Sequence, residues 1–266
     1  MYFAQLTTKV FKTVTHYLDF LDSINIGGNE MRNFLLVIFT FIYAATALAD
    51  DHKVVPGKEV GEFHYIKATN PLNIVAATDK FMASDCGKNW KAQTGANLVL
   101  MQLQGSGMSH FFYIGYSDYE KMELGQKLAN CAENFEFIQT IGANSHRDLY
   151  YNRIGELSLQ RGDWTKDTIF FKYDLYVEAP KAAEYAQAWS KMTNAIGGPG
   201  SAGLVTHFTG NGYASHFAFV GASSLSELTS ETKEAFASEA FAEFSQAVSG
   251  YRKVQNVMLV TPVKGW

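Results

Sequence analysis

Cysteine, proline and surplus basic charge are all scarce in this chain of 266 residues. Its two cysteines form no C-x-x-C pair, which argues against a structural zinc site. The 22 Lys and Arg residues are outnumbered by 26 Asp and Glu residues, for a formal net charge of −4. A chain without a basic surplus or a Lys/Arg cluster cannot neutralise many phosphates, so we expect neither nucleic acid nor an anionic membrane surface as a partner.

Long apolar runs are also few, and the most prominent, residues 34–48, is shorter than the roughly 20 residues that span a bilayer. It follows Met31 and one arginine, and it ends in an A-x-A triplet at Ala49. These features predict a secretory signal peptide over residues 31–49, cleaved between Ala49 and Asp50. We therefore expect an exported protein, periplasmic or secreted, with no stable membrane anchor after cleavage.

The predicted signal has residues 1–30 ahead of it, far more than a normal charged region. We interpret residues 1–30 as an upstream extension that is not part of the native protein. Their apolar residues at near-helical spacing leave an amphipathic helix as the alternative. Residues 50–60 are polar, contain Pro56 and are predicted to form a tether.

The rest of the chain has enough apolar sequence for a core, because 47% of the residues are hydrophobic and only 18% are charged. One stretch occurs twice: residues 96–115 and 201–221 each contain an apolar run, a Gly-x-Gly turn, Ser-His-Phe and a closing glycine. In the second, Asn211-Gly212 is a strong hairpin signal. The chain therefore reads as one unit that has been copied and fused.

Each copy is predicted to run strand, helix, strand, strand, helix, strand. We place the first copy at residues 61–160 and the second at residues 161–266, with a polar joint around residues 158–167. The first helix is expected to begin at Pro71 and to be stopped by Gly87. The next helical region is expected to pack on the core through a stripe of Leu124, Leu128, Cys131, Phe135 and Ile138.

Such a unit makes a four-stranded antiparallel sheet with both helices on one face. The other face is also apolar, as Phe112, Ile114, Ala218 and Val220 indicate, so the other copy is expected to cover it. Over residues 62–266 this element order resembles the dimeric α+β barrel superfamily, with both halves on one chain. The resemblance implies an α+β fold in which tandem duplicated ferredoxin-like units pack sheet to sheet as an intramolecular barrel.

Known families of that superfamily include cofactor-free monooxygenases, haem-degrading and haem-peroxidase-like enzymes, and small stress proteins. The resemblance therefore implies no single activity and transfers no catalytic residue.

Candidate site residues come from the two hairpins. A two-residue turn at Asn211-Gly212 would set His207 opposite His216, and a three-residue loop after Gln104 would set Gln102 opposite His110. We assign the more apolar opposite face to the helices: Val99, Leu103, Phe111, Tyr113, Leu204, Phe208, Phe217 and Phe219. The cavity between the sheets is then expected to receive the candidate ligand-binding residues Gln102, Gln104, His110, Tyr116, His207, Thr209 and His216.

Opposed histidines such as His207 and His216 would be near enough to share a metal ion, but no third ligand has convincing spacing. A haem on His110 or His216 is a further alternative, and so are histidines that are simply satisfied in the core. No cofactor is predicted. Export would allow a disulfide between Cys86 and Cys131, with free buried cysteines as the alternative.

We therefore expect an exported protein that binds a small, largely apolar molecule in the cavity between two fused half-barrels. The first alternative is a monooxygenase-like, haem-dependent or metal-dependent enzyme with His110, His207 or His216 as acid or base. The second is a structural or partner-binding domain without a ligand. A cavity above about 300 Å³ would favour the first two. The oligomeric state stays open.

Overall fold

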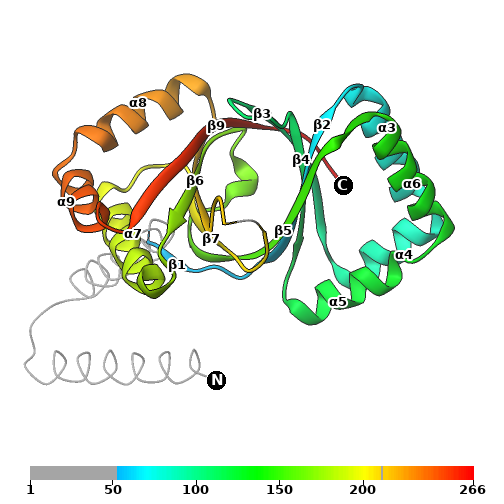
Figure 1. The fold of residues 1–266 in the computed structure, drawn as a ribbon, viewed down its shortest axis with the longest axis horizontal. Helices are drawn as coiled ribbons and strands as arrows, with labels where there is room; N and C mark the ends of the chain where they lie inside the picture. Colours follow the sequence, from blue (N-terminus) through cyan, green and yellow to red (C-terminus); the bar gives the residue numbers. More distant parts are fainter. Residues whose placement is uncertain (1–52, 211) are drawn as a thin grey trace, which may run out of the picture. The chain divides into compact units, whose positions relative to one another are not determined.

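Antiparallel strands form one nine-stranded sheet in the computed structural model, which describes residues 53–210 and 212–266 (Figure 1). The predicted extension, the signal peptide, the start of the tether and Asn211 lie outside the described residues. The strands are β1 (Val55–Pro56), β2 (Val60–Ala68), β3 (Asn97–Gln104), β4 (His110–Tyr116), β5 (Ser145–Arg161), β6 (Ile169–Val177), β7 (Ala202–His207), β8 (His216–Ala222) and β9 (Arg252–Gly265).

The helices fall between these strands in two groups. The first half carries α3 (Pro71–Ala83), α4 (Asp85–Thr94), α5 (Tyr119–Leu128) and α6 (Ala132–Ala143). The second half carries α7 (Ala182–Ile196), α8 (Leu225–Ala237) and α9 (Glu239–Val248), with short 3-10 turns η2 (Trp164–Lys166) and η3 (Ala179–Lys181). None of the helices in the described part of the chain combines the length and the apolar character needed to cross a bilayer.

The strand order shows the duplication directly. Strands run β5-β2-β4-β3 in the first half and β9-β6-β8-β7 in the second, which is the same split β-α-β-β-α-β order twice. Strand β3 pairs with β9, and β5 pairs with β7, so the two sheets join along both edges and close into a barrel. The predicted α+β architecture, two ferredoxin-like units forming one intramolecular barrel, is confirmed.

The strand registers define which positions of the two halves are equivalent. Ile66 pairs with His110 on β4, as Leu175 pairs with His216 on β8. Gln102 of β3 also pairs with His110, as Thr206 of β7 pairs with His216. Each interior or outer position of one half therefore has a counterpart in the other, and the two halves can be compared residue by residue.

The barrel interior is filled by large side chains from both halves. Phe63 of β2 lies 5.3 Å from Phe217 of β8, ring centroid to ring centroid, across the interior. Phe111, Phe217 and their neighbours belong to this interior cluster, so our assignment of that face to the helices is wrong. The misassigned residues are Val99, Leu103, Phe111, Tyr113, Phe217 and Phe219, whereas Leu204 does face the helices and Phe208 is exposed.

Two helix predictions also need correction. Gly87 lies inside α4, because Ser84 in an extended conformation already ends α3 and its hydroxyl caps α4 by accepting from the Gly87 backbone N–H. Phe135 and Ile138 are 61% and 56% exposed. The break between α5 and α6 shifts the helical phase, so the predicted stripe is not one continuous buried face.

A disulfide joins two helices of the first half. Cys86 of α4 is bonded to Cys131, the N-cap residue of α6, with the Cα atoms 6.7 Å apart. These are the two cysteines for which the sequence left a disulfide and free thiols open. The bond closes a loop that includes β3, β4 and α5.

Candidate functional site

The two Ser-His-Phe histidines lie beneath the helices. The His216 ring is 6.0 Å from the ring of Tyr185 on α7, and both His110 and His216 are buried on the outer face of the sheet. The prediction that these imidazoles line the cavity between the sheets is therefore wrong. Burial lowers the pKa of His216 to about 4 and also lowers that of His110, so both rings are neutral at pH 7.

The repeated serines explain why this motif occurs twice. Ser109 Oγ accepts a hydrogen bond from the backbone N–H of Ala68, and Ser215 Oγ accepts one from that of Val177, at 2.8 and 2.9 Å. Each hydroxyl also lies 2.9 Å from Nδ1 of the histidine that follows it. The motif fastens the start of a hairpin strand to the end of the neighbouring strand in both halves, which is a structural role.

His207 lies inside the barrel, with its ring 5.6 Å from Phe63 and 5.5 Å from Phe217. The register sets it opposite Ser215, while Thr206 lies opposite His216, so the predicted pairing of His207 with His216 is wrong. The two imidazoles are on opposite faces of the sheet and cannot share a metal ion.

The second hairpin fails to close tightly because its loop bonds to other strands. The Phe208 N–H donates to the carbonyl of Ile154 on β5 at 2.8 Å, and Thr209 Oγ1 accepts from the Ile154 N–H. The Tyr213 hydroxyl donates to the carbonyl of Gln255 on β9. These long-range bonds draw the loop away from a two-residue turn.

The other predicted site residues are not brought together. Gln102 does pair with His110, as predicted, but Gln102, Gln104 and Thr209 are exposed. Tyr116 lies beneath the helices with its ring 6.3 Å from Trp90. The predicted set therefore does not line one pocket, because its members lie inside the barrel, beneath the helices and at the surface.

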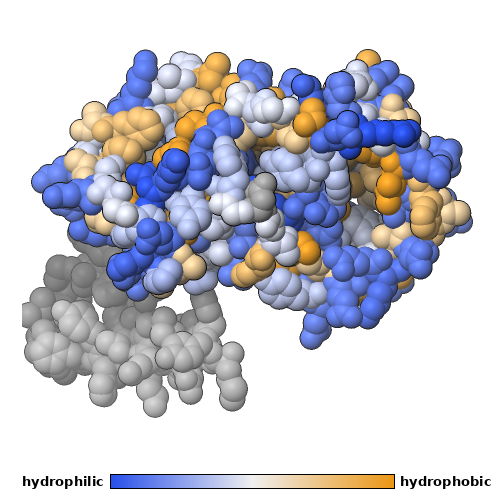
Figure 2. Space-filling model, viewed as in Figure 1, coloured by the Kyte–Doolittle hydropathy of each residue, from blue (hydrophilic) through white to orange (hydrophobic). Residues whose placement is uncertain are grey.

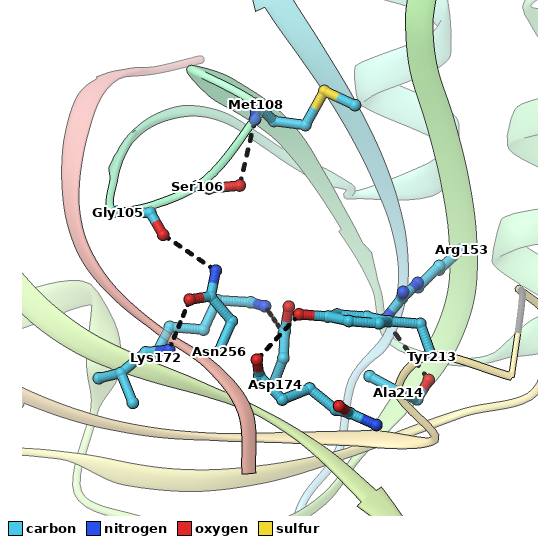
Figure 3. A network of polar contacts seen from close by, with 11 residues as sticks. Gly105, Ser106, Met108, Arg153, Lys172, Asp174, Tyr213, Ala214 and Asn256 are labelled. Carbon is cyan, nitrogen blue, oxygen red and sulfur yellow. Dashed lines mark hydrogen bonds and ion pairs between the residues drawn. The ribbon is translucent and has the colours of Figure 1, made fainter.

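The interior instead holds a buried ion pair between Lys172 and Asp174, whose side chains are 2% and 5% exposed (Figure 3). The Lys172 ammonium lies 4.3 Å from the centroid of the Phe217 ring. Both ring nitrogens of His207 are buried without a hydrogen-bond partner in the described residues. Burial, together with the charges of Lys172 and Arg153, lowers the pKa of His207 to about 2.

The fold does not require these polar groups. In the first half Phe63 stands at the position of Lys172, Tyr65 at that of Asp174 and Leu103 at that of His207. The cavity beside Lys172 measures only about 70 Å³, so most of the interior is occupied by side chains. It falls well short of the roughly 300 Å³ that we expected of an interior site for a small, largely apolar molecule.

A much larger cleft of about 490 Å³ lies on the outer face of the second half. Its floor is formed by β6 and β8, and its walls by α7, α8 and α9. The lining is mainly apolar and aromatic and includes Phe171, Tyr173, Tyr185, Trp189, Phe241 and Phe244. Figure 2 shows apolar side chains along the line where α8 faces β9, and Phe236, Val254 and Val257 are exposed at this border.

The cleft exists because the second half lacks bulk that the first half has. Ala218 stands at the position of Phe112, and Ala202 at that of Leu98. The second half also has no counterpart of α4, whose Trp90 is buried over the sheet of the first half. Residues 197–201, rich in glycine, connect α7 directly to β7.

One end of the cleft holds Arg161 and Glu231. Arg161 donates to the carbonyls of Thr193, Gly197 and Gly200, and so satisfies the C-terminal end of α7. Burial raises the pKa of Glu231, while the nearby charge of Arg161 acts in the opposite direction.

The other end holds Arg252, the first residue of β9, with its guanidinium 5.5 Å from the centroid of the Phe244 ring. The cleft is therefore apolar along its length and has charged residues at both ends.

No family model and no curated protein matches this chain. Solved structures share its fold. A candidate monooxygenase from Fusobacterium nucleatum subsp. nucleatum ATCC 25586 is 11% identical with a TM-score of 0.56, covering 79% of this chain and 94% of that one. An anthrone oxidase-like protein is 10% identical with a TM-score of 0.55, covering 80% and 95%.

A candidate monooxygenase from Lactobacillus acidophilus NCFM is 9% identical with a TM-score of 0.51, covering 78% and 95%. These proteins belong to the dimeric α+β barrel superfamily, and this chain has that fold with both halves fused. At such identities the likeness concerns the fold alone.

The residues considered for haem or metal do not fit those groups. His110 and His216 bond to serine hydroxyls beneath the helices, and no histidine lines the large cleft in the described chain. Among residues 53–210 and 212–266, the one grouping of three potential metal ligands is Cys86, Cys131 and Glu133, and its two sulfur atoms are bonded to each other.

Proposed function

We propose that the protein binds a small, largely apolar organic molecule in the outer cleft of its second half. The observation that carries this proposal is a cleft of about 490 Å³ at the place where the equivalent space of the first half is filled. Ligand sites for small organic molecules are typically concave, mostly apolar and about 300–1,000 Å³ in volume. The proposal keeps the ligand class expected from the sequence and moves it from the barrel interior to the helix-covered face.

An unfilled apolar cavity costs stability, on the order of 20 cal/mol per Å² of its surface. The first half demonstrates that this fold can fill the space with Phe112, Leu98 and Trp90. A chain that leaves the space open in one half and fills it in the other supports a use for the opening.

We also propose that the protein acts after export, because residues 31–49 have the form of a secretory signal. N-terminal sequencing of the protein from the culture medium and the periplasm tests this. A mature N-terminus at Asp50 is expected, and a cytoplasmic chain that retains residues 31–49 would contradict it.

A second candidate function, an enzyme that acts on a small molecule, is favoured by one specific observation. Lys172, Asp174 and His207 form a buried polar cluster where the first half has Phe63, Tyr65 and Leu103. Isolated polar clusters in an apolar interior are often functional. Incubating the protein with any compound it is found to bind, followed by mass spectrometry of the compound, distinguishes turnover from binding.

The binding proposal is tested by filling the cleft with the side chain of the first half. The uncharged dye N-phenyl-1-naphthylamine is expected to fluoresce on binding to the unmodified protein. Ala218→Phe should reduce the affinity for the dye at least tenfold, because the added ring occupies the floor of the cleft. The matched control is Ala143→Phe, on an exposed position of α6, which should bind the dye normally.

Thermal unfolding of both variants accompanies this titration. Loss of dye binding by Ala218→Phe with an unchanged or raised Tm supports the proposal. Absence of dye binding by the unmodified protein, or equal loss in both variants, would overturn it.

A further inference from the structure

Arg252 is a cation at one end of the cleft, and none of the described carboxylates forms an ion pair with it. Its Nε is buried and has no hydrogen-bond partner in the described residues. No ion pair joins Arg252 to a carboxylate in the part of the chain that the structure describes, and the ring of Phe244 is the neighbour of its guanidinium. A buried donor left unsatisfied typically costs about 1–3 kcal/mol, so a ligand that accepts from it gains that interaction.

Arg161, the other arginine of the cleft, is already engaged. Its guanidinium donates to three carbonyls at the end of α7 and in the loop that follows, and it has Glu231 and Asp167 as nearby negative charges. Arg161 therefore serves the fold, and Arg252 is the cation available to a ligand.

A second donor lies close to Arg252. Tyr185 lines the cleft and is almost completely buried. The Phe244 ring lies between the two groups in contact distance of both, because its centroid is 5.8 Å from that of the Tyr185 ring and 5.5 Å from the Arg252 guanidinium. Burial raises the pKa of Tyr185, and the positive charge of Arg252 acts against that rise. The phenol stays protonated at pH 7 and can donate a hydrogen bond to an anion.

The cleft between the two arginines is long and apolar. Arg252 pairs with Val177 on β6. Arg161 pairs with Ala202, which is connected through Val220 of β8 to Phe171 on β6. The two arginines therefore lie beside Val177 and Phe171 of the same strand. Six residues of strand correspond to about 20 Å. Trp189, Phe241 and other apolar side chains line this length, so there is room for an extended apolar body beyond the polar end.

We infer that the ligand is an amphipathic organic acid whose single carboxylate is received by Arg252 and whose apolar body lies along the cleft. The inference rests on the proposed function and names the ligand class. A carboxylate matches the planar fork of a guanidinium and can accept two of its N–H bonds. Tyr185 supplies a third donor, and the Phe244 ring holds the guanidinium in place.

The experiment compares decanoic acid with 1-decanol, which share a ten-carbon chain and differ in the charged head. Both are titrated as competitors of N-phenyl-1-naphthylamine at pH 8. The unmodified protein is expected to bind decanoate about 10-fold or more tightly than decanol, since a charge-assisted hydrogen bond contributes about 1.5–3 kcal/mol. Arg252→Met should remove this preference and leave decanol binding unchanged, which also demonstrates that the variant cleft is intact.

Two further variants sharpen the result. Arg252→Lys keeps the charge but loses the two-pronged geometry, so an intermediate preference is expected. Arg147→Met removes an exposed arginine of β5 and is the matched control, with the full preference retained.

Equal binding of acid and alcohol by the unmodified protein would overturn the inference and leave the proposed function standing. Binding of neither compound nor the dye would overturn the proposed function itself. If Arg252→Met still preferred the acid, another residue would bind the carboxylate, and the inference would be wrong.

Discussion

Ala218 occupies in the second half the sheet position that Phe112 occupies in the first. The surrounding anchors are the same in both halves, with Ser109 and Ser215 fastening equivalent strand ends. The first half can thus serve as a reference with which the second half is compared, position by position. Among the positions that differ, Ala218 and Ala202 lie in the outer cleft, and Lys172, Asp174 and His207 lie in the interior polar cluster.

Phe112→Ala should destabilise the protein by about 3–4 kcal/mol, because it removes a buried ring from the packed helix face of the first half. Ala218→Phe adds the same ring to open space and should change stability by less than about 1 kcal/mol. Urea unfolding followed by circular dichroism measures both. Similar losses for the two variants would contradict the view that the space over the sheet is open in the second half and filled in the first.

Lys172→Met should cost about 3–5 kcal/mol, since it leaves the buried carboxylate of Asp174 without its partner. The double variant Lys172→Phe/Asp174→Tyr copies Phe63 and Tyr65 from the first half and should recover most of that loss. Chemical denaturation gives the free energies, and failure of the double variant to recover would indicate that the interior needs the ion pair. Dye binding in the outer cleft should be unaffected by the double variant.

Stability should fall as the pH is lowered from about 6.5 to about 4. The folded-state pKa of His216 is about 4 against an ordinary value of 6.5, because burial disfavours the charged ring. The unfolded chain therefore binds more protons between these values, and the stabilisation present above pH 6.5 is lost as the pH falls through this window. The contribution is at most about 3 kcal/mol.

Urea unfolding at several pH values measures this slope. His216→Gln cannot titrate and should flatten it in proportion, whatever the variant costs at neutral pH. An unchanged slope in that variant would assign the pH dependence to other groups, of which His207, with a pKa lowered to about 2, is the first to test.

Reducing the Cys86–Cys131 disulfide should lower stability by about 2–4 kcal/mol, since the bond closes a loop spanning 45 residues in sequence. The double variant Cys86→Ala/Cys131→Ala should show the same loss without reductant and no further change with it. Tm values with and without reductant provide the measurement. The outer cleft lies in the other half, so dye affinity should stay within about twofold.

The duplication and the barrel were predictable because the residues that mark the ends of strands and helices act locally. Ser-His-Phe, the closing glycines and the helix-starting prolines recur in the same order, and each has a local reason to mark an element boundary. The fold class followed from that order alone. The helix break at Ser84 was not predicted, because glycine is the more common residue at a helix C-terminus and Gly87 therefore indicated the end of the helix.

Which face of each sheet turned inward was not predictable from polarity. Phe111 points into the barrel and Phe112 points to the helices. Because both faces of the strand are apolar, the sequence shows no alternation of polar and apolar residues that would distinguish them. The hairpin error had a different cause, namely the bonds from Phe208 and Thr209 to Ile154, which are remote in sequence.

The outer cleft did leave a signal in the sequence. Aligning the Ser-His-Phe motifs of the two copies sets Ala218 beside Phe112, and it sets the glycine-rich residues 197–200 near the place where the first copy has a helix. The match of Ala202 with Leu98 needed the strand registers, because the loop between β7 and β8 is longer than the loop between β3 and β4. The loss of a phenylalanine ring and of a helix in one copy indicates space. Nothing in the sequence indicated that Arg252 would have no ion-pair partner among the described residues, because this depends on which carboxylates the fold brings near.

The seam between β3 and β9 has a consequence for how the protein is made. During synthesis β3 emerges early, yet its outer hydrogen-bonding edge stays unpaired until β9 has been translated. In that interval β3 is an apolar strand that another nascent chain could capture. A chaperone that protects the first half, or slow translation between the two halves, would reduce this risk. The requirement follows from a barrel that closes only when strands of the second half pair with β3 and β5.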